Sequence, residues 1–151
     1  MNTRITDRDL TKQAPHSPSE RLAGFAIANR AIDKCRATQA GKPGEYHFDC
    51  PLDNMLFSFK GITGGQFKSA VQTATSYEEV GDWLLAHGSA KTPAEIKSWS
   101  DEVEAGSMMN NPEKREYFTE NCAKLGLDPK TTTTFKWLEA DDRATFNHKS
   151  V

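Results

Sequence analysis

The sequence lacks the features that usually mark secreted and membrane proteins. It has three cysteines, an odd number at wide spacing, which excludes a disulfide framework and favours a reducing, cytoplasmic compartment. No stretch approaches the roughly 20 apolar residues that a membrane span requires. The first residues, MNTRITDRD, contain no apolar run of the signal-peptide type. We therefore expect a soluble protein with no membrane partner.

The sequence also has no strong excess of charge of one sign, and it contains few large apolar residues. Lys and Arg number 19 against 21 Asp and Glu, so the net charge is −2 and gives no electrostatic reason to bind nucleic acid. Leu, Ile, Val and Phe together number 26 of 151 residues. Such a low share accompanies disorder in highly charged chains, whereas the near-zero net charge here argues against disorder. We expect aromatic residues and alanines to complete the core, while the ends and one long connection bury little.

The strongest local pattern begins at Ser17. Ser17 and Glu20 have the spacing of a capping box, and the proline between them suits the first helical position. The pattern predicts a helix over residues 18–37. Its apolar residues fall on two opposite sides, which is typical of a helix buried in the middle of a domain. Only a narrow edge with Arg30 and Lys34 is expected to face water.

Short helices are predicted after this central one. Residues 41–44, Gly-Lys-Pro-Gly, form a strong helix breaker, and residues 45–51 are expected to be an extended connection. A short helix is expected over residues 52–59, with Gly61 at its end. Four further helix starts are indicated by capping residues, at Thr63, Ser76, Thr92 and Asn111. Two helix ends are indicated by glycines, Gly88 and Gly126. The predicted fold class is all-α, an orthogonal bundle of short helices around one central buried helix.

The predicted domain organisation has three parts. Residues 1–16 form an N-terminal arm, loose at its tip and docked from Asp9 onward. Residues 17–146 form a single all-helical domain, which ends in a short helix with Thr134 as a candidate cap. Residues 147–151 form a C-terminal tail. A chain of this length has room for one core.

A line of polar residues on the central helix provides the first candidate site. Asn29, Asp33 and Arg36 share an apolar side of the helix, where unpaired polar groups are costly. A short reversal of the chain would place His47 or Asp49 against them. One interpretation is a pocket with a cation, carboxylates, an imidazole and a thiol, suited to acid–base or nucleophilic chemistry. The other is a structural network in which Asp33 pairs with Arg36.

Cys50 also has two interpretations. His47 and the helix predicted after Cys50 suggest a reactive thiolate, whereas cysteine is among the residues most often buried by packing. Cys35, His47 and Cys50 have no fourth partner at zinc spacing, so no metal and no cofactor are expected. The candidate ligand-binding residues are Asn29, Asp33, Arg36, His47, Asp49 and Cys50.

Several ordered blocks resemble an uncharacterised bacterial family, domain-of-unknown-function family 5069. These blocks are Asp9-Leu10-Thr11-Lys12 with Ser17-Pro18, Ile32 to Ala37, Gly44-Glu45-Tyr46 with Cys50-Pro51-Leu52-Asp53, and Thr131 to Phe135 with Trp137-Leu138 and Asp141-Asp142. The resemblance runs from about Asp9 to Phe146. It implies a small, soluble, intracellular bacterial protein and carries over no activity, cofactor or catalytic residue. His16 differs from the arginine that the resemblance leads us to expect there.

Two functions are consistent with these patterns. The first is a non-catalytic binding or interaction module for a small polar ligand or a protein partner. The alternative is a small enzyme that uses Cys50 or His47 with Asp33 and Arg36. The sequence identifies neither the ligand nor the oligomeric state.

Overall fold

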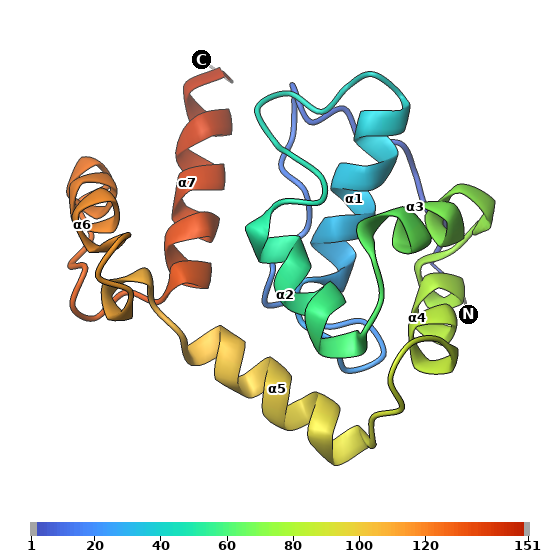
Figure 1. The fold of residues 1–151 in the computed structure, drawn as a ribbon. Helices are drawn as coiled ribbons and strands as arrows, with labels where there is room; N and C mark the ends of the chain where they lie inside the picture. Colours follow the sequence, from blue (N-terminus) through green and yellow to red (C-terminus); the bar gives the residue numbers. More distant parts are fainter. Residues whose placement is uncertain (1–2, 150–151) are drawn as a thin grey trace. The chain divides into compact units, whose positions relative to one another are not determined.

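A computed structural model describes residues 3–149, with side chains to residue 146, and within them the protein is helical (Figure 1). The elements are α1 (Ala28–Gln39), α2 (Pro51–Lys60), α3 (Gly64–Thr73), α4 (Tyr77–Ala86), α5 (Pro93–Ala105), the 3-10 helix η1 (Met108–Asn110), α6 (Arg115–Lys124) and α7 (Thr134–Lys149). Between residues 3 and 149 the only β pairing consists of two isolated bridges, Arg4 with Ser76 and Leu22 with Phe25. The all-α prediction is confirmed.

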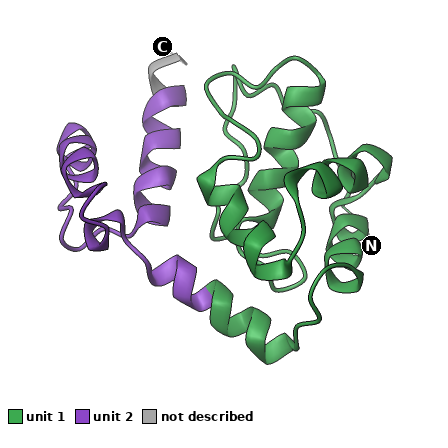
Figure 2. Cartoon of the chain, in the orientation of Figure 1, with its two compact units in different colours: residues 1–100 green, residues 101–151 purple. Residues whose placement is uncertain are grey.

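The chain divides into two compact units, Met1–Ser100 and Asp101–Val151 (Figure 2). The prediction of a single domain over residues 17–146 stays a prediction. The expected tail, residues 147–151, overlaps the end of α7, which extends to Lys149. Residues 150–151 lie outside the described part of the chain, as do residues 1–2 at the tip of the expected arm.

In unit 1, α1 packs against α2, α3 and α4. The helices around it start where capping residues predict. Thr63 and Gln66 form a complete capping box on α3, and Ser76 accepts a hydrogen bond from the Glu79 amide at the start of α4. The predicted end of α2 is also confirmed, because Gly61 adopts φ 71°, a conformation that suits glycine. Local signals therefore place α2, α3 and α4.

The start of the central helix differs from the prediction. α1 begins at Ala28, ten residues after the proposed start, and residues 17–27 form turns. Ala23 and Gly24 have φ values of 52° and 89°, and Leu22 and Phe25 exchange backbone hydrogen bonds of 2.8 and 3.0 Å across them. Two consecutive positive φ values are typical of a type I′ turn. The Ser17 pattern thus begins a turn and not the helix.

A side chain from α5 explains why this turn prevails over the local capping signal. Ser100 is fully buried, and its hydroxyl accepts a hydrogen bond from the Ala26 amide at 3.0 Å. The same hydroxyl donates to the Gly24 carbonyl at 2.7 Å. Since buried backbone groups require partners, these two hydrogen bonds stabilise the turn against a continuous helix.

The N-terminal arm is docked from Thr3, earlier than the Asp9 that the sequence suggests. The Ile5 amide donates to the Thr75 carbonyl at 3.0 Å, and the Tyr77 amide donates to the Thr3 carbonyl at 2.9 Å. Ile5 and Leu10 are buried. The arm is therefore part of the core of unit 1.

Unit 2 has its own small core of Phe118, Cys122 and Trp137, surrounded by partly buried Met108, Met109, Leu125, Leu127 and Leu138. Gly126 ends α6 with φ 71°, as predicted. Three predictions are wrong here. α6 starts at Arg115, because Asn111 accepts a hydrogen bond from the Glu113 amide within a preceding turn. α7 has 16 residues and is not short, and Thr133 caps it in place of Thr134 by accepting from the Lys136 amide at 3.1 Å.

Candidate functional site

Three charged side chains of α1 are buried inside unit 1. Arg30, Asp33 and Lys34 are 3%, 0% and 3% exposed. The solvent-facing edge predicted for Arg30 and Lys34 is therefore wrong. Buried charges are costly unless they are paired, so the partners of these residues determine what the site can do. Arg30 lies over the ring of Tyr46, 5.4 Å from its centroid, and donates to the His16 carbonyl.

Asp33 is at the centre of the first group of charges, the Asp33 cluster, which also contains Arg8, His16 and Tyr77. One carboxylate oxygen accepts hydrogen bonds from the backbone amide of His16 at 2.7 Å and from its Nδ1 at 2.5 Å. The other oxygen accepts from the Tyr77 hydroxyl at 2.5 Å. Burial, together with the Asp33 charge, raises the pKa of Tyr77, so this hydroxyl keeps its proton.

The tautomer of His16 follows from the same contacts. Arg8 Nη2 lies 3.3 Å from His16 Nε2, and a guanidinium can only donate. In the neutral ring this contact assigns Nε2 as the acceptor and Nδ1 as the donor to Asp33, and Nε2 also lies 3.7 Å from the Glu20 carboxylate. A histidine oriented by a carboxylate resembles the base of a catalytic pair, but here its second nitrogen is already occupied. The Asp33 cluster instead connects the arm, α1 and α4.

The other residues of the predicted polar line do not converge on Asp33. Arg36 donates from Nε to Asp7 at 2.7 Å and from Nη1 to the Val71 carbonyl. The predicted pairing of Asp33 with Arg36 is therefore wrong, because each side chain has its own partner. Asn29 is half-buried on the same helix.

A second group of charges lies where α2 begins. This thiol site consists of Lys34, Asp49, Cys50 and Asp53. Lys34 Nζ lies 2.8 Å from Asp53 Oδ1, off the line of a well-directed hydrogen bond, so the contact is an ion pair. The same ammonium donates to Cys50 Sγ at 3.3 Å. Asp53 Oδ2 accepts from the Asp49 amide at 2.9 Å, which fixes the carboxylate between the two elements.

The rest of the connection does not reach Asp33 or Arg36. His47 is exposed, and Asp49 has φ 62° with its carboxylate accepting from the Asn54 side chain at 2.9 Å. Asp49 also lies directly against Gly64 at the start of α3, where any Cβ would overlap the carboxylate. The chain reversal that would place His47 or Asp49 against Asp33 is therefore not formed. Of the six predicted residues, only Asp49 and Cys50 share a site.

Sequence reasoning missed His16, Tyr77, Lys34 and Asp53. The one available signal for the Asp33 cluster was position 16, where the resemblance leads us to expect an arginine. An arginine there would pair with the Asp33 carboxylate in place of His16. Lys34 and Asp53 stood inside the quoted blocks but carried no pattern that linked them.

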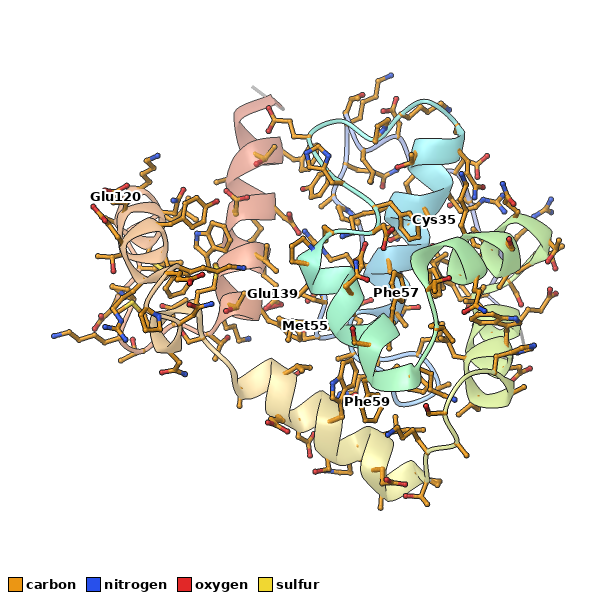
Figure 3. The ribbon with its side chains drawn as sticks, viewed as in Figure 1. Cys35, Met55, Phe57, Phe59, Glu120 and Glu139 are labelled. Carbon is orange, nitrogen blue, oxygen red and sulfur yellow. The ribbon has the colours of Figure 1, made fainter. Side chains whose placement is uncertain are left out.

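The three cysteines differ in accessibility. Cys35 and Cys122 are buried, and Cys50 is partly exposed. Figure 3 shows Cys35 on α1 and Phe57 on α2 among the packed side chains of unit 1. Burial raises the pKa of Cys35 to about 12 and also raises that of Cys122. Cys50 is therefore the thiol that a dissolved reagent can reach.

Burial of Cys35 predicts that the protein loses stability in alkaline solution. An unfolded thiol ionises near pH 9.0, whereas Cys35 keeps its proton to about 12, so between these values the folded state holds a proton that the unfolded state has lost. The stabilising contribution is complete below the lower value and is lost as the pH rises. At about pH 10 the loss of unfolding free energy should be about 1.4 kcal/mol.

Urea unfolding at about pH 8 and about pH 10 measures this loss, and the Cys35→Val variant should lack the part that comes from the thiol. An equal loss in that variant would contradict the prediction.

Residues 3–149 contain no helix that is both long and apolar enough to cross a membrane. The described side chains also form no group of three His, Cys, Asp or Glu residues with the geometry of a metal site.

Comparison with known proteins assigns nearly the whole chain to one family. No curated protein was found to match it. A family model described as "Domain of unknown function (DUF5069)" matches residues 12–144, which include the Asp33 cluster from His16 onward and the whole thiol site. The chain therefore belongs to the DUF5069 family.

Proposed function

We propose that unit 1 is a non-catalytic binding module that holds a small polar ligand at the thiol site. The observation that carries this proposal is the position of Cys50, a partly exposed residue whose Sγ lies 3.3 Å from the ammonium of Lys34. A partly exposed thiol beside an ammonium is one environment in which reactive cysteines occur, and here the carboxylate of Asp53 lies against the same ammonium. The ligand class that fits is a small molecule with an anionic group next to a sulfur-reactive atom.

The start of α2 supports an anionic ligand group. Cys50 is the N-cap residue and makes no side-chain capping hydrogen bond. The Cys50 side chain therefore caps neither the Leu52 nor the Asp53 amide, and helix N-termini favour negative groups. Lys34 is 4% exposed at its side chain. A folded protein surface would meet only Cys50 and its exposed neighbours, so we propose a small group as the ligand.

The contacts of Asp33 and Arg36 disfavour the enzyme alternative. That alternative needs Cys50 or His47 to work with Asp33 and Arg36. Asp33 is engaged by His16 and Tyr77, and Arg36 by Asp7. Lys34 is ion-paired with Asp53. Neither helix of the site thus offers the thiol a free general base.

Two disulfide reagents of opposite charge test the proposal. Thiol–disulfide exchange with the anionic 5,5′-dithiobis(2-nitrobenzoate) should be about fivefold faster than with cationic cystamine, after each rate is divided by that of free cysteine. This ratio corresponds to about 1 kcal/mol, the upper range for a partly exposed ion pair. The Cys50→Ala variant should lose the fast phase.

The matched control removes both charges of the ion pair. Lys34→Gln combined with Asp53→Asn leaves no buried unpaired charge, and the preference for the anionic reagent should disappear. Equal normalised rates in the unchanged protein would refute the proposal. So would steady turnover of 4-nitrophenyl acetate that depends on Cys50, because a binding module should release at most one equivalent of nitrophenolate per chain.

A further inference from the structure

We infer that the thiol site is also a redox-controlled modification site, at which dioxygen joins Lys34 Nζ to Cys50 Sγ through a single bridging oxygen atom. The inference rests on the proposed function in one respect, the accessibility of the Cys50 thiol. We infer that the covalent link between Lys34 and Cys50 prevents the thiol site from binding its ligand.

The two atoms are already close enough for this link. Lys34 Nζ donates to Cys50 Sγ at 3.3 Å, and the lysine is held in place by Asp53 at 2.8 Å. An N–O–S bridge holds nitrogen and sulfur slightly closer than this, so a fraction of a bond length of movement is enough. The ion pair keeps the long Lys34 side chain ordered and reduces the entropy that the link must remove.

Burial favours the bridge over competing reactions. Cys50 is a partly exposed residue, which allows dioxygen to approach, whereas the Lys34 side chain is 4% exposed, so little water competes for the intermediate. The other thiols in the chain are poor partners for a disulfide. Cys35 and Cys122 are buried, and burial raises the pKa of both. Lys34 is thus the amine next to Cys50 once dioxygen has added to Sγ. Its nitrogen bonds to the oxygen carried by Sγ and not to the sulfur itself, and the O–O bond breaks as the second oxygen leaves.

The reaction balances with dioxygen as the only oxidant. The Lys34 ammonium, the Cys50 thiol and one O2 give the N–O–S link, one water and one proton. Nitrogen and sulfur lose two electrons each, and dioxygen takes up four. One oxygen atom remains in the bridge and the other leaves as water. Asp53 Oδ1, 2.8 Å from Nζ, is placed to accept the proton as the ammonium is consumed.

The link changes the charge of the site. Lys34 ceases to be a cation, and the fully buried Asp53 loses its counter-charge. The attraction for an anionic ligand group disappears, and the thiol is occupied. Two equivalents of a dithiol supply the four electrons that restore lysine, cysteine and water. The site would therefore bind its ligand only under reducing conditions.

Mass spectrometry of the full chain tests the inference. After incubation in air-saturated buffer, the intact protein should gain one oxygen and lose two hydrogens, with one thiol fewer per chain. Proteolysis should yield a cross-linked pair of peptides that contain residues 34 and 50, and dithiothreitol should separate them. Cys50→Ser should abolish the link. Lys34→Arg keeps the charge opposite Asp53, so it should fold and also fail to cross-link.

Other oxidation products would refute the inference. These are a gain of whole oxygen atoms at Cys50 without loss of hydrogen, a disulfide-linked dimer, or an unchanged mass after full exposure to air. The outcomes also separate the two proposals. A missing cross-link with an intact preference for the anionic disulfide refutes only the bridge, whereas a cross-link in a protein with no such preference refutes only the binding proposal.

Discussion

Replacing Asp53 with alanine is expected to lower the free energy of unfolding by about 3–5 kcal/mol, the cost of leaving a buried charge without its partner. The ammonium of Lys34 is 4% exposed, and Asp53 is its only anionic partner among the described residues. The substitution also removes the acceptor for the Asp49 amide. Urea unfolding followed by circular dichroism measures the loss.

A double-mutant cycle shows whether the ion pair is the cause. Asp53→Ala with Lys34→Met removes both charges and should recover part of the stability, because an apolar pair of similar volume is often tolerated. Asp82 on α4 is exposed, so Asp82→Ala is the matched control and should stay within about 0.5 kcal/mol of the unchanged protein. A coupling energy below about 0.5 kcal/mol would mean that the two residues do not act as a pair.

Asp33→Ala is expected to have an effect of similar size, about 3–5 kcal/mol, and to loosen the N-terminal arm. The carboxylate accepts three hydrogen bonds, two from His16 and one from Tyr77. Tyr77→Phe removes only one of them and should cost about 1–3 kcal/mol, the range for a hydrogen bond to a charged group. Denaturant unfolding gives both values.

Hydrogen exchange distinguishes a loosened arm from a general loss of stability. The Ile5 amide is bonded to the Thr75 carbonyl, so its protection reports whether the arm is docked. In Asp33→Ala this amide should exchange faster than amides in the middle of α3. If the Ile5 amide and the amides of α3 lose protection by the same factor, Asp33 supports unit 1 as a whole and does not specifically hold the arm.

The parts of the fold that the sequence predicts are those decided within a few residues. The capping box of Thr63 and Gln66 and the αL glycine at position 61 require no distant partner, and both form as expected. The start of α1 is decided elsewhere. The hydroxyl of Ser100 stabilises the turn that holds Gly24 and Ala26, and no local pattern around Ser17 contains that information.

The partners of the candidate residues could not be predicted from the sequence. Periodicity identified Asp33 as a polar group on a buried face, but His16 and Tyr77, which satisfy it, lie on other segments. Lys34 was assigned to solvent because a charged residue on a helix is usually exposed. A sequence pattern records polarity and does not distinguish a solvated lysine from one buried in an ion pair with Asp53.

The docked arm also determines how unit 1 must fold. Helical proteins usually fold quickly because their contacts join residues close in sequence. Here the arm closes onto residues 75–77, and the turn before α1 is completed by Ser100, 74 and 76 positions from its partners Ala26 and Gly24. The contact order of unit 1 is therefore raised by its first residues, which leave the ribosome early and find their partners only after α4 and α5 have been synthesised. Its folding rate should resemble that of a mixed α/β domain more closely than that of a local helical bundle.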